Sequence, residues 1–155
     1  MNILANDGIH PAGQKALEAA GHNLWTEFIE PQSLAAFIND NAIDGLLVRS
    51  ATKGREPLID ACPNLGFIIR GGVGMDNIDV AYARDHGKEV RNTPAASSQS
   101  VAELVMGHLF ALSRSLHDSN RRMPVEGVEQ FKALKKSYGK GRELRGMTLA
   151  IVGFG

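Results

Sequence analysis

Short apolar runs alternate with longer segments of helical period along the first 94 residues, and this alternation is the feature that most limits the fold. The runs predict strands at residues 2–7, 23–28, 44–50, 67–69 and 88–94, and the segments between them predict helices at 11–21, 31–41, 56–61 and 77–87. The run at 44–50 has a continuous apolar centre, which suits a strand covered on both faces. Strict alternation of strand and helix predicts an α/β fold with a parallel, doubly wound sheet.

The character of the chain changes after Pro94. "AASSQS" reads as a small polar linker, and Ser100 with Glu103 forms a capping-box pattern that predicts a helix start. The helix should run to about residue 116, with apolar residues around much of its circumference. It must therefore be buried, either by core packing alone or in a subunit interface. A polar surface excursion over 118–146 and a final strand at 148–152 should follow.

Composition excludes several functional classes. Seventeen basic residues balance seventeen acidic ones, so no electrostatic footprint for nucleic acid or an anionic membrane is present. No signal peptide or stretch of about 20 apolar residues is found, which indicates a cytoplasmic protein. Cys62 is alone and is expected to be a small core residue. The five histidines are scattered without acidic partners, and neither a metal site nor a catalytic base can be assembled from them.

Two loops that follow neighbouring expected strands have the composition of anion sites. "VRSAT" places Arg49 and Ser50 after one strand, and "IIRGGVGMDNID" places Arg70 before a glycine-rich turn. The carboxyl ends of strands face the ligand crevice in open α/β sheets. The turn's glycines allow backbone N–H groups to converge on an anion, and arginine adds a planar cation. The two loops together predict the edge of an anion-binding cleft.

The last eight residues, "TLAIVGFG", combine an apolar run with the beginning of a dinucleotide fingerprint. Gly153 and Gly155 supply the first two glycines of that pattern. The third glycine, the helix whose N-terminus faces the pyrophosphate, and the distant acidic residue are not in these 155 residues.

At "VRSATK", "RGGVGMDNID", "NTP", "SVAEL" and "LRGMTLAIVGFG" the sequence resembles the D-isomer-specific 2-hydroxyacid dehydrogenases, most strongly those that oxidise 3-phosphoglycerate. The resemblance implies a flavodoxin-like substrate-binding domain over 1–96, followed over 97–155 by the first helix and strand of a Rossmann NAD-binding domain. It implies two sets of site residues: Arg49, Ser50, Arg70, Gly71, Gly72 and Val73 for the substrate, and Gly153 and Gly155 for the cofactor.

The activity implied by the resemblance is oxidation of a D-2-hydroxy acid by NAD, with 3-phosphoglycerate as the expected substrate and serine biosynthesis as the setting. The resemblance also implies a homodimer or tetramer formed through the helix at 100–116. The family's catalytic Arg, Glu and His match no position up to residue 155, so these residues alone are expected to be an inactive N-terminal part. Two alternatives are a non-catalytic flavodoxin-like module that binds an anion or a protein, and a corepressor related to the family.

Overall fold

The structure of the chain, a computed structural model, describes residues 1–153. Backbone contacts divide the chain into two compact units, Met1–Ser97 and Ser98–Gly155, and each is described by itself. None of the described helices combines the length and the hydropathy that a bilayer crossing requires.

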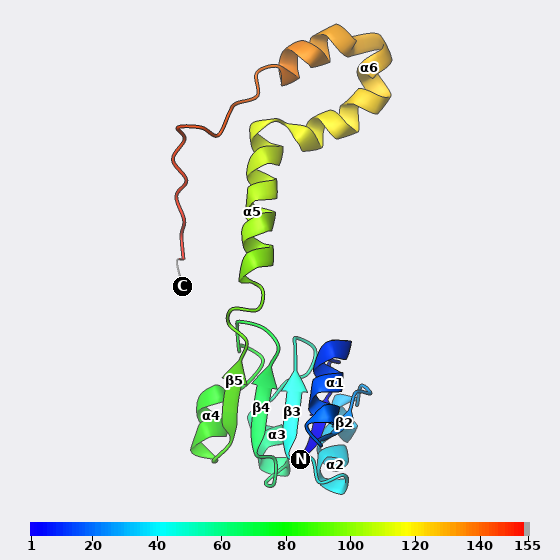
Figure 1. The fold of residues 1–155 in the computed structure, drawn as a ribbon, viewed down its shortest axis with the longest axis vertical. Coiled ribbons are helices and arrows are strands. Elements are labelled where there is room, and N and C mark those ends of the chain that lie inside the picture. Colours follow the sequence, from blue (N-terminus) through cyan, green and yellow to red (C-terminus); the bar gives the residue numbers. More distant parts are fainter. Residues whose placement is uncertain (154–155) are drawn as a thin grey trace. The chain divides into compact units, whose positions relative to one another are not determined.

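The first unit is built on a five-stranded sheet in which every pairing is parallel (Figure 1). The strand order is β2-β1-β3-β4-β5, the order of flavodoxin-like folds. The strands are β1 Asn2–Ala5, β2 Asn23–Trp25, β3 Gly45–Val48, β4 Phe67–Arg70 and β5 Glu89–Asn92, and the helices between them are α1 Pro11–Ala19, α2 Pro31–Asp40, α3 Glu56–Ala61 and α4 Val80–Asp85. The predicted α/β class, the parallel sheet and the order of these nine elements are confirmed.

The hydrophobic core lies on one face of the sheet. One row across the sheet is formed by residues that pair in register, and all of them are buried: Leu4, Leu46, Ile68 and Val90. The helices α2, α3 and α4 contact one another in series over this face and bury Leu34, Ile38, Ile59 and Ala83 against it. Cys62 is fully buried in the same cluster, so its predicted core role is confirmed.

The opposite face of the sheet is covered less completely. The helix α1 buries none of its own residues, and Leu47 and Ile69, which point to this face, are only half-buried. Both residues line a cavity of about 690 Å³ that reaches the carboxyl edge of the sheet. The sheet is therefore closed on one face and leaves space for a ligand beside the other.

Gly45 and Phe67 are paired in register on β3 and β4. A Cβ atom added at Gly45 would lie 1.9 Å from the Phe67 ring carbon Cζ. The aromatic ring therefore occupies the space that a side chain at residue 45 would need.

The second unit consists of two helices, α5 Ser98–Ser113 and α6 Leu116–Tyr138. The helix expected from Ser100 to about residue 116 begins at Ser98 and stops earlier, because Ser115 adopts a left-handed backbone conformation at φ 52°. Ser100 thus lies inside the helix, and Glu103 accepts a hydrogen bond from the Gln99 side chain at 2.8 Å instead of forming a capping box. Much of the expected surface excursion is helical in α6.

The prediction of a strand at 148–152 is wrong, because the backbone of these residues is irregular in the structure. A strand needs a neighbour to pair its N–H and C=O groups, and the part of the second unit up to residue 153 contains no strand. An apolar run alone therefore did not suffice to form a strand.

Candidate substrate site at the carboxyl edge of the sheet

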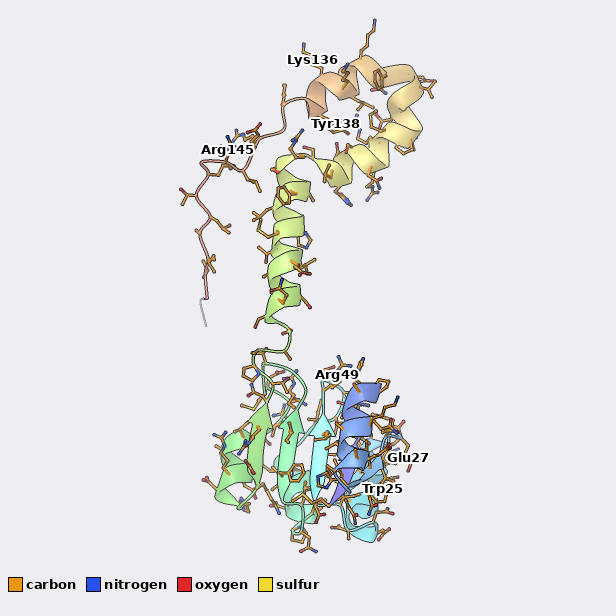
Figure 2. The ribbon with its side chains drawn as sticks, in the orientation of Figure 1. Trp25, Glu27, Arg49, Lys136, Tyr138 and Arg145 are labelled. Carbon is orange, nitrogen blue, oxygen red and sulfur yellow. The ribbon has the colours of Figure 1, made fainter. Side chains whose placement is uncertain are left out.

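The loops that follow β1, β3 and β4 meet at one edge, because parallel strands all end on the same side of a sheet. Arg49 lies at the end of β3 (Figure 2) and lines two adjoining cavities of about 450 and 690 Å³. The smaller cavity is also lined by Asp7 and Ser50, and the larger by Gly71 and Thr93. This edge includes the point between β1 and β3 where the strand order reverses, the usual ligand position in such sheets.

Asp7, on the loop after β1, reaches 42 residues along the chain to the loop after β3. Its Oδ2 accepts the backbone N–H of Arg49 at 2.6 Å, and both of its oxygens accept that of Thr52 at 3.1 Å. The Thr52 hydroxyl donates to Oδ1 as well. Burial raises the pKa of Asp7, but the hydrogen bonds from Thr52, Arg49 and Ala51 outweigh it and hold the pKa below 3.8. Asp7 is therefore ionised and is an internal ligand of this loop.

Two asparagines hold the same loop from its other sides. The Asn6 side chain donates to the Thr52 hydroxyl at 2.8 Å, and Asn77 donates to the Arg49 and Thr52 carbonyls at 3.0 and 2.7 Å. Both asparagines are buried. We call the two hydrogen bonds from Asn77, in the "MDNID" segment, the clamp on the β3 loop. With the bonds from Asp7 and Asn6, they hold the chain from Arg49 to Thr52 at both ends.

The glycine-rich loop after β4 is held through its carbonyl groups. The Gly72 carbonyl accepts the Thr93 N–H at 3.1 Å, the Val73 carbonyl accepts from the Asn92 side chain, and the Gly74 carbonyl accepts from the Arg70 guanidinium. Because C=O and N–H point in opposite directions across a trans peptide, the N–H groups of Val73 and Gly74 face away from these partners. Neither N–H has a hydrogen-bond partner within residues 1–153.

The predicted donors in this loop therefore differ in availability. Gly71 donates its N–H to the Val48 carbonyl at 2.8 Å and Gly72 donates to the Arg70 carbonyl at 3.0 Å, whereas Val73 is free to bind a ligand. Gly74, one of the turn glycines expected to bind an anion but not one of the substrate residues that the resemblance implies, offers a second free donor. None of Gly71, Gly72 and Gly74 adopts a left-handed backbone conformation.

The two predicted arginines have different surroundings. Arg70 forms an ion pair with Asp76 at 2.7 Å, and the hydrogen bond from its guanidinium holds the pKa of Asp76 below its ordinary value. Its side chain is mostly buried and holds the glycine-rich loop together. Arg49 has no ion-pair partner among residues 1–153, and its aliphatic stem lies beside Gly71. The cation at the cavity that has no internal carboxylate partner is therefore Arg49.

The predicted cofactor glycines are not brought into a site by the described residues. Gly153 has φ 83°, which suits the tight turn of a dinucleotide loop, but the chain before it is irregular and no helix lies between residues 138 and 153. Gly155 lies outside the described residues. A pyrophosphate needs converging N–H groups at a helix start, so residues 1–153 do not fit this part of a dinucleotide.

Sequence reasoning missed Asp7, Asn6 and Asn77, whose side chains hold the loop after β3 that carries Arg49. The available signal was position: Asp7 follows β1 just as Arg49 follows β3, and the ends of parallel strands converge. Asn77 gave no such signal, because an asparagine in "DNID" is equally typical of a helix start.

Comparison with known proteins gives the site its context. Residues 3–150 match the family model of the D-isomer specific 2-hydroxyacid dehydrogenase catalytic domain. Hydroxypyruvate reductase of Thermotoga maritima is 44% identical over 130 residues, which cover 84% of this chain and 40% of that protein. D-3-phosphoglycerate dehydrogenase of Methanocaldococcus jannaschii is 37% identical over 155 residues, 100% of this chain and 28% of that protein.

A solved structure with the same fold is the NAD⁺-bound 3-phosphoglycerate dehydrogenase of Entamoeba histolytica. It matches with a TM-score of 0.60 and 30% identity, over 74% of this chain and 39% of that one. The chain thus spans well under half the length of these relatives.

Proposed function

The chain belongs to the D-isomer specific 2-hydroxyacid dehydrogenases, and from this membership we propose that its first unit binds the anionic end of a D-2-hydroxy acid or the corresponding 2-oxo acid. In this proposal the Arg49 guanidinium and the Val73 N–H hold the substrate carboxylate, with the Gly74 N–H as a further donor. Ser50 lies at the rim of the cavity as an additional hydrogen-bonding group.

One observation carries the proposal. Arg49, whose side chain has no ion-pair partner within residues 1–153, packs its aliphatic stem beside Gly71 and lines the cavity, and the peptide N–H groups of Val73 and Gly74 in the same loop are also unpaired. This is the edge of the sheet where ligands bind. A carboxylate accepts hydrogen bonds from both kinds of donor, and charge-assisted bonds of this kind are among the strongest in proteins.

We propose 3-phosphoglycerate as the substrate, in keeping with the relative that matches the whole chain. The second candidate is hydroxypyruvate, favoured by the 44% identity to a hydroxypyruvate reductase. The two differ in the phosphate group and at C2, which carries a hydroxyl in 3-phosphoglycerate and a carbonyl in hydroxypyruvate. A clear affinity advantage for 3-phosphoglycerate would favour the first candidate.

We propose NAD as the cofactor of the whole protein, supported by the NAD⁺-bound relative and by the fingerprint glycines Gly153 and Gly155. We also propose that the 155 residues alone bind the acid without oxidising it. Within residues 1–153 the residues that line the cavity offer no free base. Both Asp7 oxygens already accept hydrogen bonds. His10 Nδ1 accepts the Ala12 N–H at 3.2 Å, so the other nitrogen of a neutral ring, Nε2, carries the proton and cannot accept one.

The test is a titration of the ¹⁵N-labelled chain, followed by NMR, with 3-phosphoglycerate, hydroxypyruvate and glycerol 3-phosphate. The last compound keeps the phosphate and lacks the carboxylate. We expect the Val73 and Gly74 amide resonances to shift with the two acids only. Arg49→Gln should weaken binding about tenfold to a hundredfold, the range for a charge-assisted pair. Equal shifts with glycerol 3-phosphate, or unchanged affinity in Arg49→Gln, would show that no carboxylate site exists here.

A further inference from the structure

Asp7 carries an inference that rests on the proposed substrate site and goes beyond it. We infer that Asp7 is a positioning residue for the substrate: its carboxylate takes up the amide groups of the β3 loop, keeps them from the substrate anion, and fixes Arg49 at the cavity.

Both oxygens of Asp7 are in use. Oδ2 accepts from the Arg49 N–H and Oδ1 accepts from the Thr52 hydroxyl, while the Thr52 N–H lies 3.1 Å from both. The carboxylate therefore occupies the place that a bound carboxylate would take over this loop. The substrate anion must bind instead to the Arg49 side chain and to the glycine-rich loop.

The position of Arg49 depends on this arrangement. Its N–H is held by Asp7 and its carbonyl by Asn77, so both backbone groups of the residue are fixed. Its Cγ lies 3.6 Å from the place where a Cβ at Gly71 would be. The guanidinium is thus carried on a fixed backbone beside the loop that offers the free N–H groups. Fixing the backbone that carries the cation before the ligand arrives avoids the entropy loss of ordering this backbone on binding.

Asparagine cannot replace Asp7 in this role. One oxygen would become an NH₂ group, and in either orientation that group would face a backbone donor, the Arg49 N–H or the Thr52 N–H. Where it faces the Thr52 hydroxyl, that hydroxyl would have to accept the hydrogen bond that it now donates. Asp7→Asn should therefore release the loop although it preserves the size of the side chain. This distinguishes loop positioning from simple space filling.

The experiment compares wild type with Asp7→Asn, Arg49→Gln and the double variant, in the 155-residue chain. Asp40→Asn serves as the matched control, because Asp40 is an exposed carboxylate at the end of α2 and is not one of the residues that hold the β3 loop by hydrogen bonds. Two quantities are measured at a temperature where every variant is folded: the Kd for 3-phosphoglycerate, and amide hydrogen exchange at Arg49 and Thr52 without ligand. The double variant tests whether Asp7 acts through Arg49, because effects that share one route are not additive.

We expect Asp7→Asn to weaken 3-phosphoglycerate binding about tenfold and to speed exchange at both amides, with Asp40→Asn unchanged. In the Arg49→Gln background, Asp7→Asn should have little further effect. Binding by Asp7→Asn within about twofold of wild type, or full additivity of the two substitutions, would overturn the inference and leave the proposed function intact. Absence of binding by the wild-type chain would overturn both.

Discussion

Replacement of Asn77 by alanine tests the clamp on the β3 loop most directly. The side chain is 6% exposed and donates two hydrogen bonds, to the Arg49 and Thr52 carbonyls. Each bond contributes about 1 kcal/mol, and the buried Thr52 carbonyl left without a donor adds a desolvation cost of about 1 kcal/mol or more. Asn77→Ala should therefore lower the free energy of unfolding by about 2–4 kcal/mol. The free energy of unfolding of a domain of this size is about 5–15 kcal/mol in total, so this decrease is a large part of it.

Trp25 provides the assay. It is the single tryptophan of the chain, lies in β2 (Figure 2) and packs against the core, so its fluorescence reports unfolding of the first unit in urea. Asn77→Asp should cost more than alanine, because a carboxylate would face two carbonyl oxygens. Asp76→Asn is the neighbouring control: Asp76 is 87% exposed, and because solvent screens an exposed ion pair, its loss should change the free energy of unfolding little. A loss below about 0.5 kcal/mol in Asn77→Ala would refute the clamp.

Three further perturbations follow from the same structure. Because hydrogen bonds hold the folded-state pKa of Asp7 below 3.8, its stabilisation is present above that pH and is lost as the pH falls through the folded-state value. The difference in unfolding free energy between wild type and Asp7→Asn should thus narrow below pH 3.8 in urea titrations at stepped pH. Lys88 is buried and donates hydrogen bonds to the Cys62 and Pro63 carbonyls. Lys88→Met should therefore lower the free energy of unfolding, measured by calorimetry, by about 2 kcal/mol. Leu104 is 61% exposed on α5, and if this helix joins subunits, sedimentation should show association that Leu104→Glu abolishes.

Local pattern was enough for the first unit. The apolar runs around Leu46 and Ile68 lie between helix signals, and both became central strands of the predicted sheet. The same rule failed at 148–152, where an equally apolar run has no strand to pair with in the described part of its unit. Strand formation depends on a neighbour, and one run of residues does not specify its neighbour.

The candidate site was predictable in outline only. Arg49 and the glycine-rich loop could be placed at one edge, because both follow adjacent parallel strands. The bonds from Asp7 and Asn77 cross 25 to 45 residues of sequence, and no local pattern specifies them. For the same reason, the sequence could not show that the Gly71 and Gly72 N–H groups are used internally while that of Val73 is free.

The contact between Gly45 and Phe67 has a consequence for how this sequence can vary. The ring fills the volume beside the glycine, so any larger residue at 45 collides with it, and a smaller residue at 67 leaves a void over the backbone. Substitution at either position alone should therefore lower stability. A simultaneous change to a larger residue at 45 and a smaller one at 67 would keep the total side-chain volume. The two positions should therefore be inherited as one unit, and their joint variation would mark the β3–β4 register in distant homologues.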